Sequence, residues 1–364
     1  PVDIDRLLIV TFTNAAAGEM RERVAASLLR QLAQNPGSGR LRRQLALLGS
    51  ARIQTVHSFC LDLVRQNFSL CGVSPSFRLL DKAESELLKD QAMEEALEKK
   101  YAQEQGDLDF QAAVENFAED RGDRKLQSAA RELYNKLRSH ADPQGWLDRA
   151  IETVKLAAGS QPQDLPWSQE LLKFCLETLD YQQRRLLQAS RLLEEDPKVQ
   201  EKYGPAFDYC LAAAQTMRQA AAQGWDECYQ ALSLFEKPRL AAVRGADKEL
   251  TDQLKQAKDD FSDSVAFLAQ QVVSRPGEQV RREMALSLPI LRGLAGLERA
   301  FEAEYDQIKR RENVLDFSDL EHLALGLLTD EKTGAPSQLA QQLAQGITEI
   351  LVDEYQDTNE IQDS

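Results

Sequence analysis

The amino-acid sequence predicts an α/β fold that is interrupted by a large, all-helical insertion. Short apolar runs rich in β-forming residues occur at residues 7–13, 52–56 and 350–352, and helical patterns follow the first two. A long stretch dominated by Ala, Leu, Gln, Glu, Lys and Arg separates the second run from the third and has no convincing strand pattern. We therefore expect an α/β domain made of residues 1–80 and 313–364, with residues 81–312 as the helical insertion.

The first 80 residues predict the order β-α-β-α. Asn14 follows the first strand and is expected to cap a helix. The apolar face of that helix recurs every four residues, at Met20, Val24, Leu28 and Leu32. Ser58 follows the second strand and is expected to cap the next helix, whose apolar face carries Cys60, Val64 and Phe68.

The insertion follows a short extended piece at residues 77–80. Asp81 and Glu84 have the spacing of a capping box, so a helix is expected to begin there. Glycine and proline predict loops near residue 122 and at residues 159–166, 204–205 and 275–277. Apolar residues spaced by threes and fours predict one long helix, and these are Leu250, Leu254, Ala257, Phe261, Val265, Leu268 and Val272. A coiled coil and an ordinary bundle helix both fit that spacing.

The last 50 residues return to α/β signals. Residues 315–320 open a helix, and Asp316 and Asp319 are expected to cap it rather than to carry chemistry. A loop at residues 334–336 and a further helix follow. The strand at residues 350–352 then runs directly into a group of acidic side chains.

Composition fits a soluble globular protein, with 43% apolar and 28% charged residues. No apolar run approaches the roughly 20 residues that a membrane helix needs, so no membrane association is expected. The five scattered cysteines form no CxxC pair, which predicts buried thiols in a reducing, cytoplasmic setting. The net charge of −15 argues against nucleic-acid binding unless the acidic surface faces away from it.

The acidic group that follows the third strand has the form of a nucleotide-hydrolysis site. Asp353 and Glu354 come directly after an apolar triplet. Hydrolases of this type use one carboxylate at such a strand end for hydrated Mg²⁺ and a second one to activate the attacking water. An adjacent Asp-Glu pair is common, and a solvated strand end explains the pair equally well when it is considered alone.

The longer strings resemble motifs of the UvrD-like superfamily 1 helicases. Residues 353–359, DEYQDTN, match motif II. Residues 11–17, TFTNAAA, resemble motif Ia, and residues 55–59, TVHSF, resemble the next DNA-contacting motif. The three matches fall in the right order along the chain. The family has a RecA-like P-loop motor fold, so the resemblance implies a partial motor domain with a large helical insertion.

Further strings narrow the resemblance to the AddA subunits of AddAB helicase–nucleases, which process broken DNA ends for recombinational repair. These strings are FRLLD at residues 77–81, Tyr305 and Lys309 at a spacing of four, and LDFSDL at residues 315–320. The length of the helical insertion agrees with them. The resemblance implies ATP and Mg²⁺ as cofactors, single-stranded DNA and DNA ends as partners, and an AddB-like partner subunit.

The resemblance also assigns roles to individual residues. Asp353 would bind Mg²⁺ through water, Glu354 would be the catalytic base, and Gln356 would sense the γ-phosphate and couple it to DNA. The path of the single strand would be lined by Phe12, Thr13, Asn14, Thr55, His57, Ser58 and Phe59. Aromatic faces and small polar donors are typical of such paths. Without the motifs, Phe12 would fit a core position and His57 a structural histidine.

The phosphate-binding loop GxxxxGK[ST] of the family occurs nowhere in the sequence. We therefore expect an internal piece of a longer protein, without its phosphate loop, second motor domain and nuclease domain, and inactive as an ATPase by itself. Two alternatives stay open at this stage. One is a UvrD/PcrA- or RecB-type helicase that is not an AddA subunit, and the other is a non-enzymatic helical interaction module that binds no DNA.

Overall fold

The computed structural model describes residues 2–102, 106–117, 122–330 and 333–364, and the chain forms two compact units. The first unit is Pro1–Arg149 with Ile290–Ser364, and the second is Ala150–Pro289. The predicted insertion therefore contributes its first helices to the same unit as the sheet. Within the described residues, no helix is both long and apolar enough to cross a membrane.

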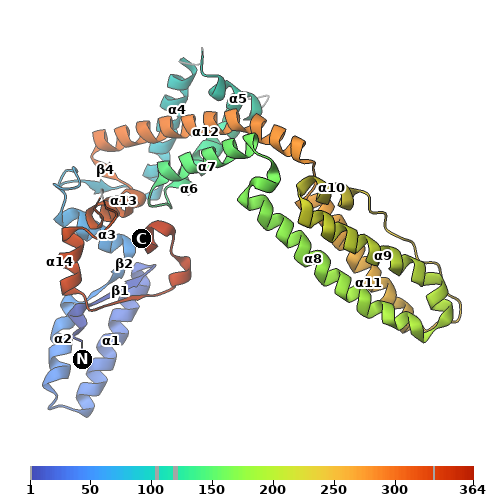
Figure 1. Ribbon diagram of the computed structural model, residues 1–364. Coiled ribbons are helices and arrows are strands. Elements are labelled where there is room, and N and C mark those ends of the chain that lie inside the picture. Colours follow the sequence, from blue (N-terminus) through green and yellow to red (C-terminus); the bar gives the residue numbers. More distant parts are fainter. Residues whose placement is uncertain (1, 103–105, 118–121, 331–332) are drawn as a thin grey trace. The chain divides into compact units, whose positions relative to one another are not determined.

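The first unit contains a parallel sheet of three strands, in the order β2-β1-β5. These strands are β1 Leu7–Thr11, β2 Arg52–Thr55 and β5 Glu349–Val352, so the three predicted strands are confirmed. Parallel pairing requires that the chain cross over between neighbouring strands. Helices α1 Asn14–Gln34 and α2 Gly39–Leu47 make the crossover from β1 to β2, and they lie side by side as a hairpin (Figure 1).

The structure corrects the two predicted helix caps near these strands. Thr13, and not Asn14, caps α1, because its hydroxyl accepts a hydrogen bond from Ala16 N at 3.1 Å. Thr55, and not Ser58, caps α3 Val56–Gln66. Each threonine has extended backbone angles at the point where its strand ends, which is the conformation that an N-cap requires. The helices therefore begin earlier than the sequence predicts.

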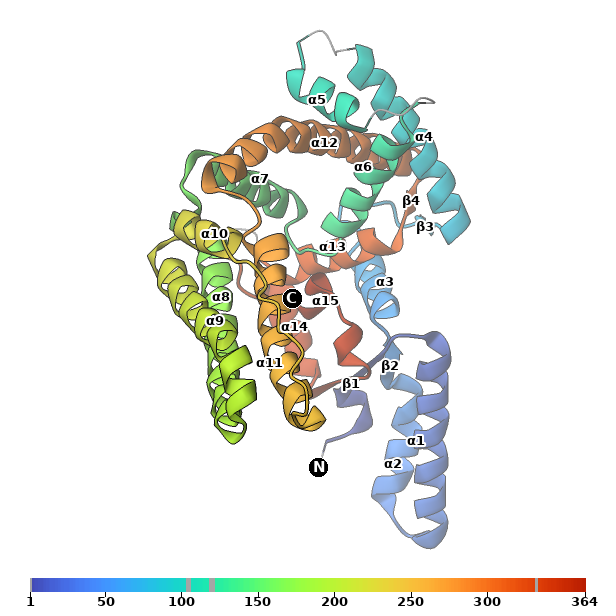
Figure 2. The same cartoon turned by 90° about the vertical axis from the view of Figure 1, so that its right-hand side faces the viewer.

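The helices of the first unit that follow pack around α12 (Figure 2). They are α4 Lys82–Ala102, α5 Leu108–Phe117, α6 Arg124–Leu137, α7 Pro143–Gly159 and α12 Gly277–Glu312, of which α7 and α12 extend into the second unit. The predicted capping box before α4 is confirmed, since Asp81 and Glu84 each accept a hydrogen bond from the other's backbone N–H. The buried core of these helices includes Phe110, Tyr134, Phe301 and Tyr305.

The remaining elements complete the path back to the sheet. A two-stranded parallel sheet pairs β3 Arg78–Leu79 with β4 Val314–Leu315. Asp316 and Asp319 then form a capping box at the start of α13, which confirms the capping role expected for them. The last elements are α13 Phe317–Leu328, α14 Gln338–Gly346 and α15 Glu360–Asp363.

The second unit is a bundle in which α8, α9 and α11 run side by side (Figures 1 and 2). Its helices are α8 Pro166–Arg191, α9 Pro197–Gln223, α10 Trp225–Ser233 and α11 Lys248–Phe267. The long helix predicted around residues 250–272 is confirmed as α11, which continues into a π-helical turn at Leu268–Val272. It packs as a bundle helix, since its apolar face belongs to the buried core of this unit.

The loop predicted at residues 204–205 is wrong, because both residues lie inside α9. Proline inside a helix removes one hydrogen bond to the carbonyl four residues earlier. Pro205 and Glu201 are not buried, so water can solvate that carbonyl. Tyr203 and Phe207 are fully buried on the opposite side, and their packing outweighs the local preference for a loop.

Gly293 marks the closest approach of α12 to α5. A Cβ atom added at Gly293 would lie 2.0 Å from the carbonyl oxygen of Asp109. We predict that Gly293→Ala destabilises the first unit by about 1–3 kcal/mol, as overpacking does, although alanine favours helices. The measurement is urea unfolding followed by Trp146 fluorescence in a Trp167→Phe, Trp225→Phe background, since Trp146 is the sole tryptophan of that unit.

The matched control is Gly326→Ala in α13, where an added Cβ meets no atom within 4 Å. This substitution is expected to stabilise the unit by about 0.5–1 kcal/mol. Equal effects of the two substitutions would contradict the close approach of α12 to α5.

Glu298 of α12 is fully buried. Its Oε2 accepts a hydrogen bond from Gln144 Nε2 at 3.4 Å, and its Oε1 has no hydrogen-bond partner in the part of the chain that the structure describes. Burial, with the nearby Glu302 carboxylate, raises the pKa of Glu298 from its ordinary 4.5 to about 7. Because the folded-state pKa is the higher one, the stability that this group contributes is complete below pH 4.5 and is lost as the pH rises through 7.

We predict that Glu298→Gln makes the first unit less sensitive to pH between 5 and 8. The amide cannot ionise, so the wild-type loss of stability at the upper end of this range should shrink. Urea midpoints from Trp146 fluorescence at several pH values measure this. Glu312→Gln, at the exposed end of the same helix, should leave the pH dependence as it is in the wild type.

Candidate functional site

The predicted site residues follow three strands that end at the same edge of one sheet. In the parallel register, Thr11 of β1 pairs with Thr55 of β2, and Val10 pairs with Val352 of β5. The backbone N–H of Asp353 continues this pairing, with a hydrogen bond of 2.9 Å to Val10 O. The sheet thus brings three segments that are far apart in the sequence to one edge, as expected for nucleotide and ligand sites of open α/β sheets.

The turn after β1 is fixed by two threonines. Thr11 is buried, and its hydroxyl donates a 3.0 Å hydrogen bond to Thr13 O. Phe12 is 39% exposed, so the core position that its apolar strand allows is not where the ring lies. Asn14 is exposed in the first turn of α1. An exposed aromatic ring beside a hydroxyl and an amide offers a stacking face and polar contacts to a nucleic-acid strand.

The turn after β2 is held more tightly. Thr55 is buried, and its hydroxyl lies 2.9 Å from the Ser58 hydroxyl and accepts from Ser58 N at 3.1 Å. His57 Nε2 lies 3.2 Å from Glu321 Oε1, and the His57 ring meets the Phe317 ring edge-on at 5.0 Å. Phe59 packs against the buried cluster of α3 and α13. His57 is therefore anchored to α13 while 39% of its side chain stays exposed.

The acidic residues after β5 occupy a special backbone conformation. Glu354 lies in the left-handed region, with φ 53° and ψ 43°, which is uncommon for a residue other than glycine. Such conformations gather at functional sites. Gln356 Nε2 donates a hydrogen bond to Glu354 Oε2, so the two side chains are oriented together. The left-handed turn redirects the chain immediately after the sheet edge.

The end of the acidic string is fixed by polar contacts to other elements. Asn359 and Gln362 form a capping box at the start of α15. Gln362 Nε2 also donates to Glu321 Oε1 at 2.7 Å. Nearby, Glu360 Oε2 lies 2.5 Å from His140 Nδ1. The sequence analysis assigned no role to Glu321 or Gln362, and no motif marks either of them, because their contacts join distant parts of the chain.

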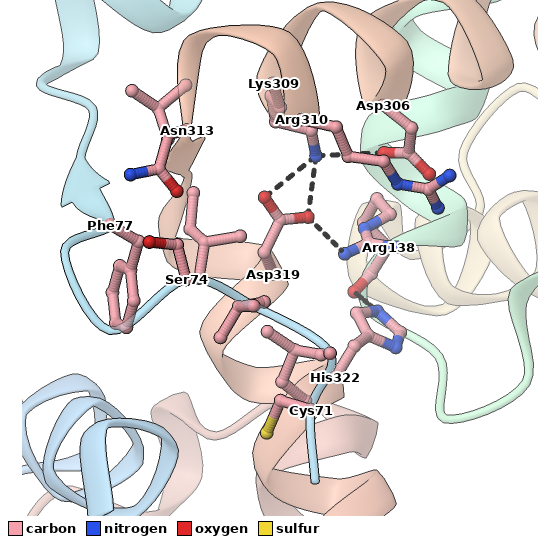
Figure 3. A pocket seen from close by; sticks show the side chains of 15 residues that line it. Cys71, Ser74, Phe77, Arg138, Asp306, Lys309, Arg310, Asn313, Asp319 and His322 are labelled. Atoms are coloured by element: carbon pink, nitrogen blue, oxygen red, sulfur yellow. Dashed lines mark hydrogen bonds and ion pairs between the residues drawn. The ribbon is translucent and has the colours of Figure 1, made fainter. Parts of the chain in front are cut away.

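A second group of buried charges lies where α12 meets α13 (Figure 3). Lys309 Nζ donates to both carboxylate oxygens of Asp319, at 2.6 and 2.8 Å, and Arg138 donates to the same carboxylate at 3.2 Å. Tyr305, four residues before Lys309, donates to Asp316 Oδ2 at 3.1 Å. Burial acts to lower the pKa of Lys309, but the carboxylates of Asp319 and Asp316 outweigh it and raise that pKa.

These buried charges line a pocket of about 720 Å³. Its charged walls include Arg138, Asp306, Lys309 and Asp319, and Figure 3 shows the ion pairs that join them. His322 lies on the same wall, where burial, together with the positive charge of Arg138, lowers its pKa to about 4. Since these charges satisfy one another, we interpret the group as a structural joint between helices.

The donor chemistry at the sheet edge suits a magnesium nucleotide. Asp353 is exposed, and its carboxylate has no hydrogen-bond or ion-pair partner within the described ranges. Mg²⁺ in nucleotide sites is held by one or two carboxylates, water and the phosphates. Among the described residues, no three His, Cys, Asp or Glu side chains gather to hold a metal ion without such a ligand. The residues present therefore fit a metal that arrives with its nucleotide.

The family of UvrD/REP helicase N-terminal domains matches residues 1–364, which is the whole chain. The chain belongs to this family. The family membership agrees with the resemblance of the three motifs and with the parallel sheet that brings them together. It also agrees with the expected α/β fold carrying a helical insertion.

The similar curated proteins share one name, that of the AddA subunit of an ATP-dependent helicase/nuclease. The chain is 35% identical to the protein of this name from Acetivibrio thermocellus over 372 residues, and 38% identical to that from Pelotomaculum thermopropionicum over 372 residues. It is 34% identical over 373 residues to a protein of this name from Bacillus cereus. Each match covers 100% of this chain, which spans about 30% of the length of these relatives.

We predict that the two threonine caps hold the site turns in place. Thr55→Ala should destabilise α3 by about 1 kcal/mol, because the first turn loses its hydroxyl acceptor. Thr55→Ser should keep most of that stability. Amide hydrogen exchange of a peptide that covers residues 56–66 measures the effect. Equal protection in the two variants would contradict the capping role.

Proposed function

We propose that this chain supplies part of the first motor domain of an ATP-dependent DNA helicase that translocates on single-stranded DNA. The observation that carries the proposal is the shared edge of the parallel sheet. There the acidic pair after β5 lies next to the turns after β1 and β2, which match the DNA-contacting motifs. Residues 1–80 and 313–364 would belong to the motor, and residues 81–312 would be its insertion.

On the nucleotide side, three residues have proposed roles. Asp353 would hold Mg²⁺ through water, and the metal would neutralise developing charge on the phosphates when it is bound. Glu354 would accept a proton from the attacking water as the general base. Gln356 would sense the γ-phosphate, and its hydrogen bond to Glu354 supports a role in orienting the base.

On the DNA side, seven residues would line the path of the single strand. Exposure of Phe12 supports stacking against a base, and the hydroxyls and amide near it support contacts to phosphates. The seven are Phe12, Thr13, Asn14, Thr55, His57, Ser58 and Phe59. Phe59 and Thr55 are held against their neighbours, so they would position this turn more than they touch the strand.

For the longer protein, we propose the activity that the name of the relatives carries, an ATP-dependent helicase and nuclease. It would process broken DNA ends for recombinational repair in the cytoplasm, together with an AddB-like partner subunit. Two RecA-like domains would close on ATP and reopen after hydrolysis, and alternating grip would move the protein along the strand. The identity of 34–38% with proteins of this name favours an AddA subunit over a UvrD/PcrA- or RecB-type helicase.

The isolated chain should not hydrolyse ATP. Its sequence has no GxxxxGK[ST] loop, whose backbone N–H groups and lysine cradle the phosphates in this class of enzyme. ATPase activity of residues 1–364 alone, abolished by Glu354→Gln, would overturn this part of the proposal.

The decisive experiment compares the longer protein with its Glu354→Gln variant. If Glu354 is the general base, ATP turnover stimulated by single-stranded DNA should fall at least about 100-fold, because an amide accepts no proton. Binding of ATP and of DNA should persist within a few-fold. Steady-state ATPase assays and filter binding measure these quantities.

Glu349→Gln is the matched control. It removes an exposed carboxylate from the other end of the same strand, so turnover should stay at the wild-type level. Full turnover in the Glu354→Gln variant would leave the acidic pair as a solvated strand end.

A further inference from the structure

Glu321 joins the two sides of the candidate site through a single oxygen atom. This residue of α13 is only 8% exposed. Its Oε1 lies 3.2 Å from His57 Nε2 and accepts a hydrogen bond from Gln362 Nε2 at 2.7 Å. His57 belongs to the turn after β2, and Gln362 to the helix after the acidic string. One carboxylate oxygen is therefore shared by both segments.

The contact continues from Gln362 into the acidic string. Gln362 Oε1 accepts from Asn359 N at 3.4 Å, and Gln362 N donates to Asn359 Oδ1 at 2.9 Å. The turn before Asn359 is closed by two backbone hydrogen bonds, from Thr358 N to Tyr355 O at 3.1 Å and from Asp357 N to Glu354 O at 2.9 Å. A series of short polar contacts and one tight turn thus leads from the His57 ring to the backbone of Glu354.

The charge of Glu321 is kept by these same contacts. Burial acts to raise the pKa of its carboxyl, but the hydrogen bonds from His57 and Gln362 outweigh burial and lower that pKa. A buried carboxylate depends strongly on the donors that satisfy it. Two donors that share one oxygen also affect each other, since a change at one alters the acceptor available to the other.

A pocket of about 360 Å³ lies directly beside this series of contacts. Its walls include His57, Glu321, Asn359 and Gln362, and also the cationic side chains of Lys89 and Arg138. The volume falls within the range of small-ligand pockets, which begins at roughly 300 Å³. A DNA strand that contacts His57 would therefore have room next to the residues that make up the series.

We propose that Glu321 is a positioning residue that couples DNA at His57 to the orientation of the segment carrying Glu354. DNA that engages His57 changes the demand on Glu321 Oε1. The bond from Gln362 responds, and with it the capping box that ends the acidic string. This inference rests on the proposed function, and it adds a residue of α13 that lies outside the three matched motifs.

The test uses the longer protein and the Glu321→Gln variant, with ATPase rates measured without DNA and over a range of single-stranded DNA concentrations. We expect the DNA-free rate to stay within about twofold of the wild type. The stimulation by saturating DNA should fall at least tenfold. The dissociation constant for DNA should change by no more than about threefold, since Glu321 itself does not touch the strand.

Glu360→Gln is the matched control for a purely structural role. It removes the contact of Glu360 with His140, which also holds α15 in place but does not involve Glu321. We expect it to keep the wild-type stimulation. A similar loss of stimulation in this variant, or an equal reduction of the DNA-free and stimulated rates by Glu321→Gln, would overturn the proposal.

Hydrogen exchange offers a second readout that does not depend on catalysis. In the wild type, added single-stranded DNA should increase protection of a peptide that covers residues 353–362. In Glu321→Gln this increase should be absent, and unchanged protection in both proteins would overturn the coupling. A wild-type protein without any DNA-stimulated ATPase would instead refute the proposed function, which is a separate result.

Discussion

The ion pair between Lys309 and Asp319 is the contact on which the return of the chain to the sheet depends. Lys309 lies near the end of α12, is 3% exposed, and donates to both oxygens of a carboxylate at the start of α13. Loss of one partner from such a buried pair destabilises a protein by about 3–5 kcal/mol, because the other charge stays unpaired. Arg138, directly after α6, joins the same carboxylate, so three helices meet at one point.

From that junction the chain reaches the candidate site by a short route. Helix α13 carries Asp319 in its first turn and Glu321 two residues later, so one turn of helix is fixed by buried charges on one side and contacts the site on the other. The sheet edge then depends on few residues: two threonines that cap helices, and one left-handed glutamate. Rigid local geometry at strand ends is what a hydrolytic site needs to align its groups.

Local patterns in the sequence predict much of this fold. Apolar periodicity predicts the three strands and the long helix α11, and the spacing of Asp81 with Glu84 predicts a capping box. Two kinds of feature escape such patterns. Pro205 lies in a helix because tertiary packing outweighs local preference, and Glu321 meets His57 and Gln362 only after the chain has folded. The acidic string predicts the chemistry of the site, whereas the contacts that orient it come from elements elsewhere in the sequence.

The two compact units are joined by helices and not by loops. The boundary falls inside α7 at residues 149 and 150, and inside α12 at residues 289 and 290. An α-helix turns by about 100° per residue, so adding or deleting one residue near either crossing would rotate everything beyond it. Changes in insertion length that preserve helical phase are therefore confined to whole turns there. The segment between α10 and α11, residues 234–247, imposes no such phase, and it is the natural place for related chains to differ in length.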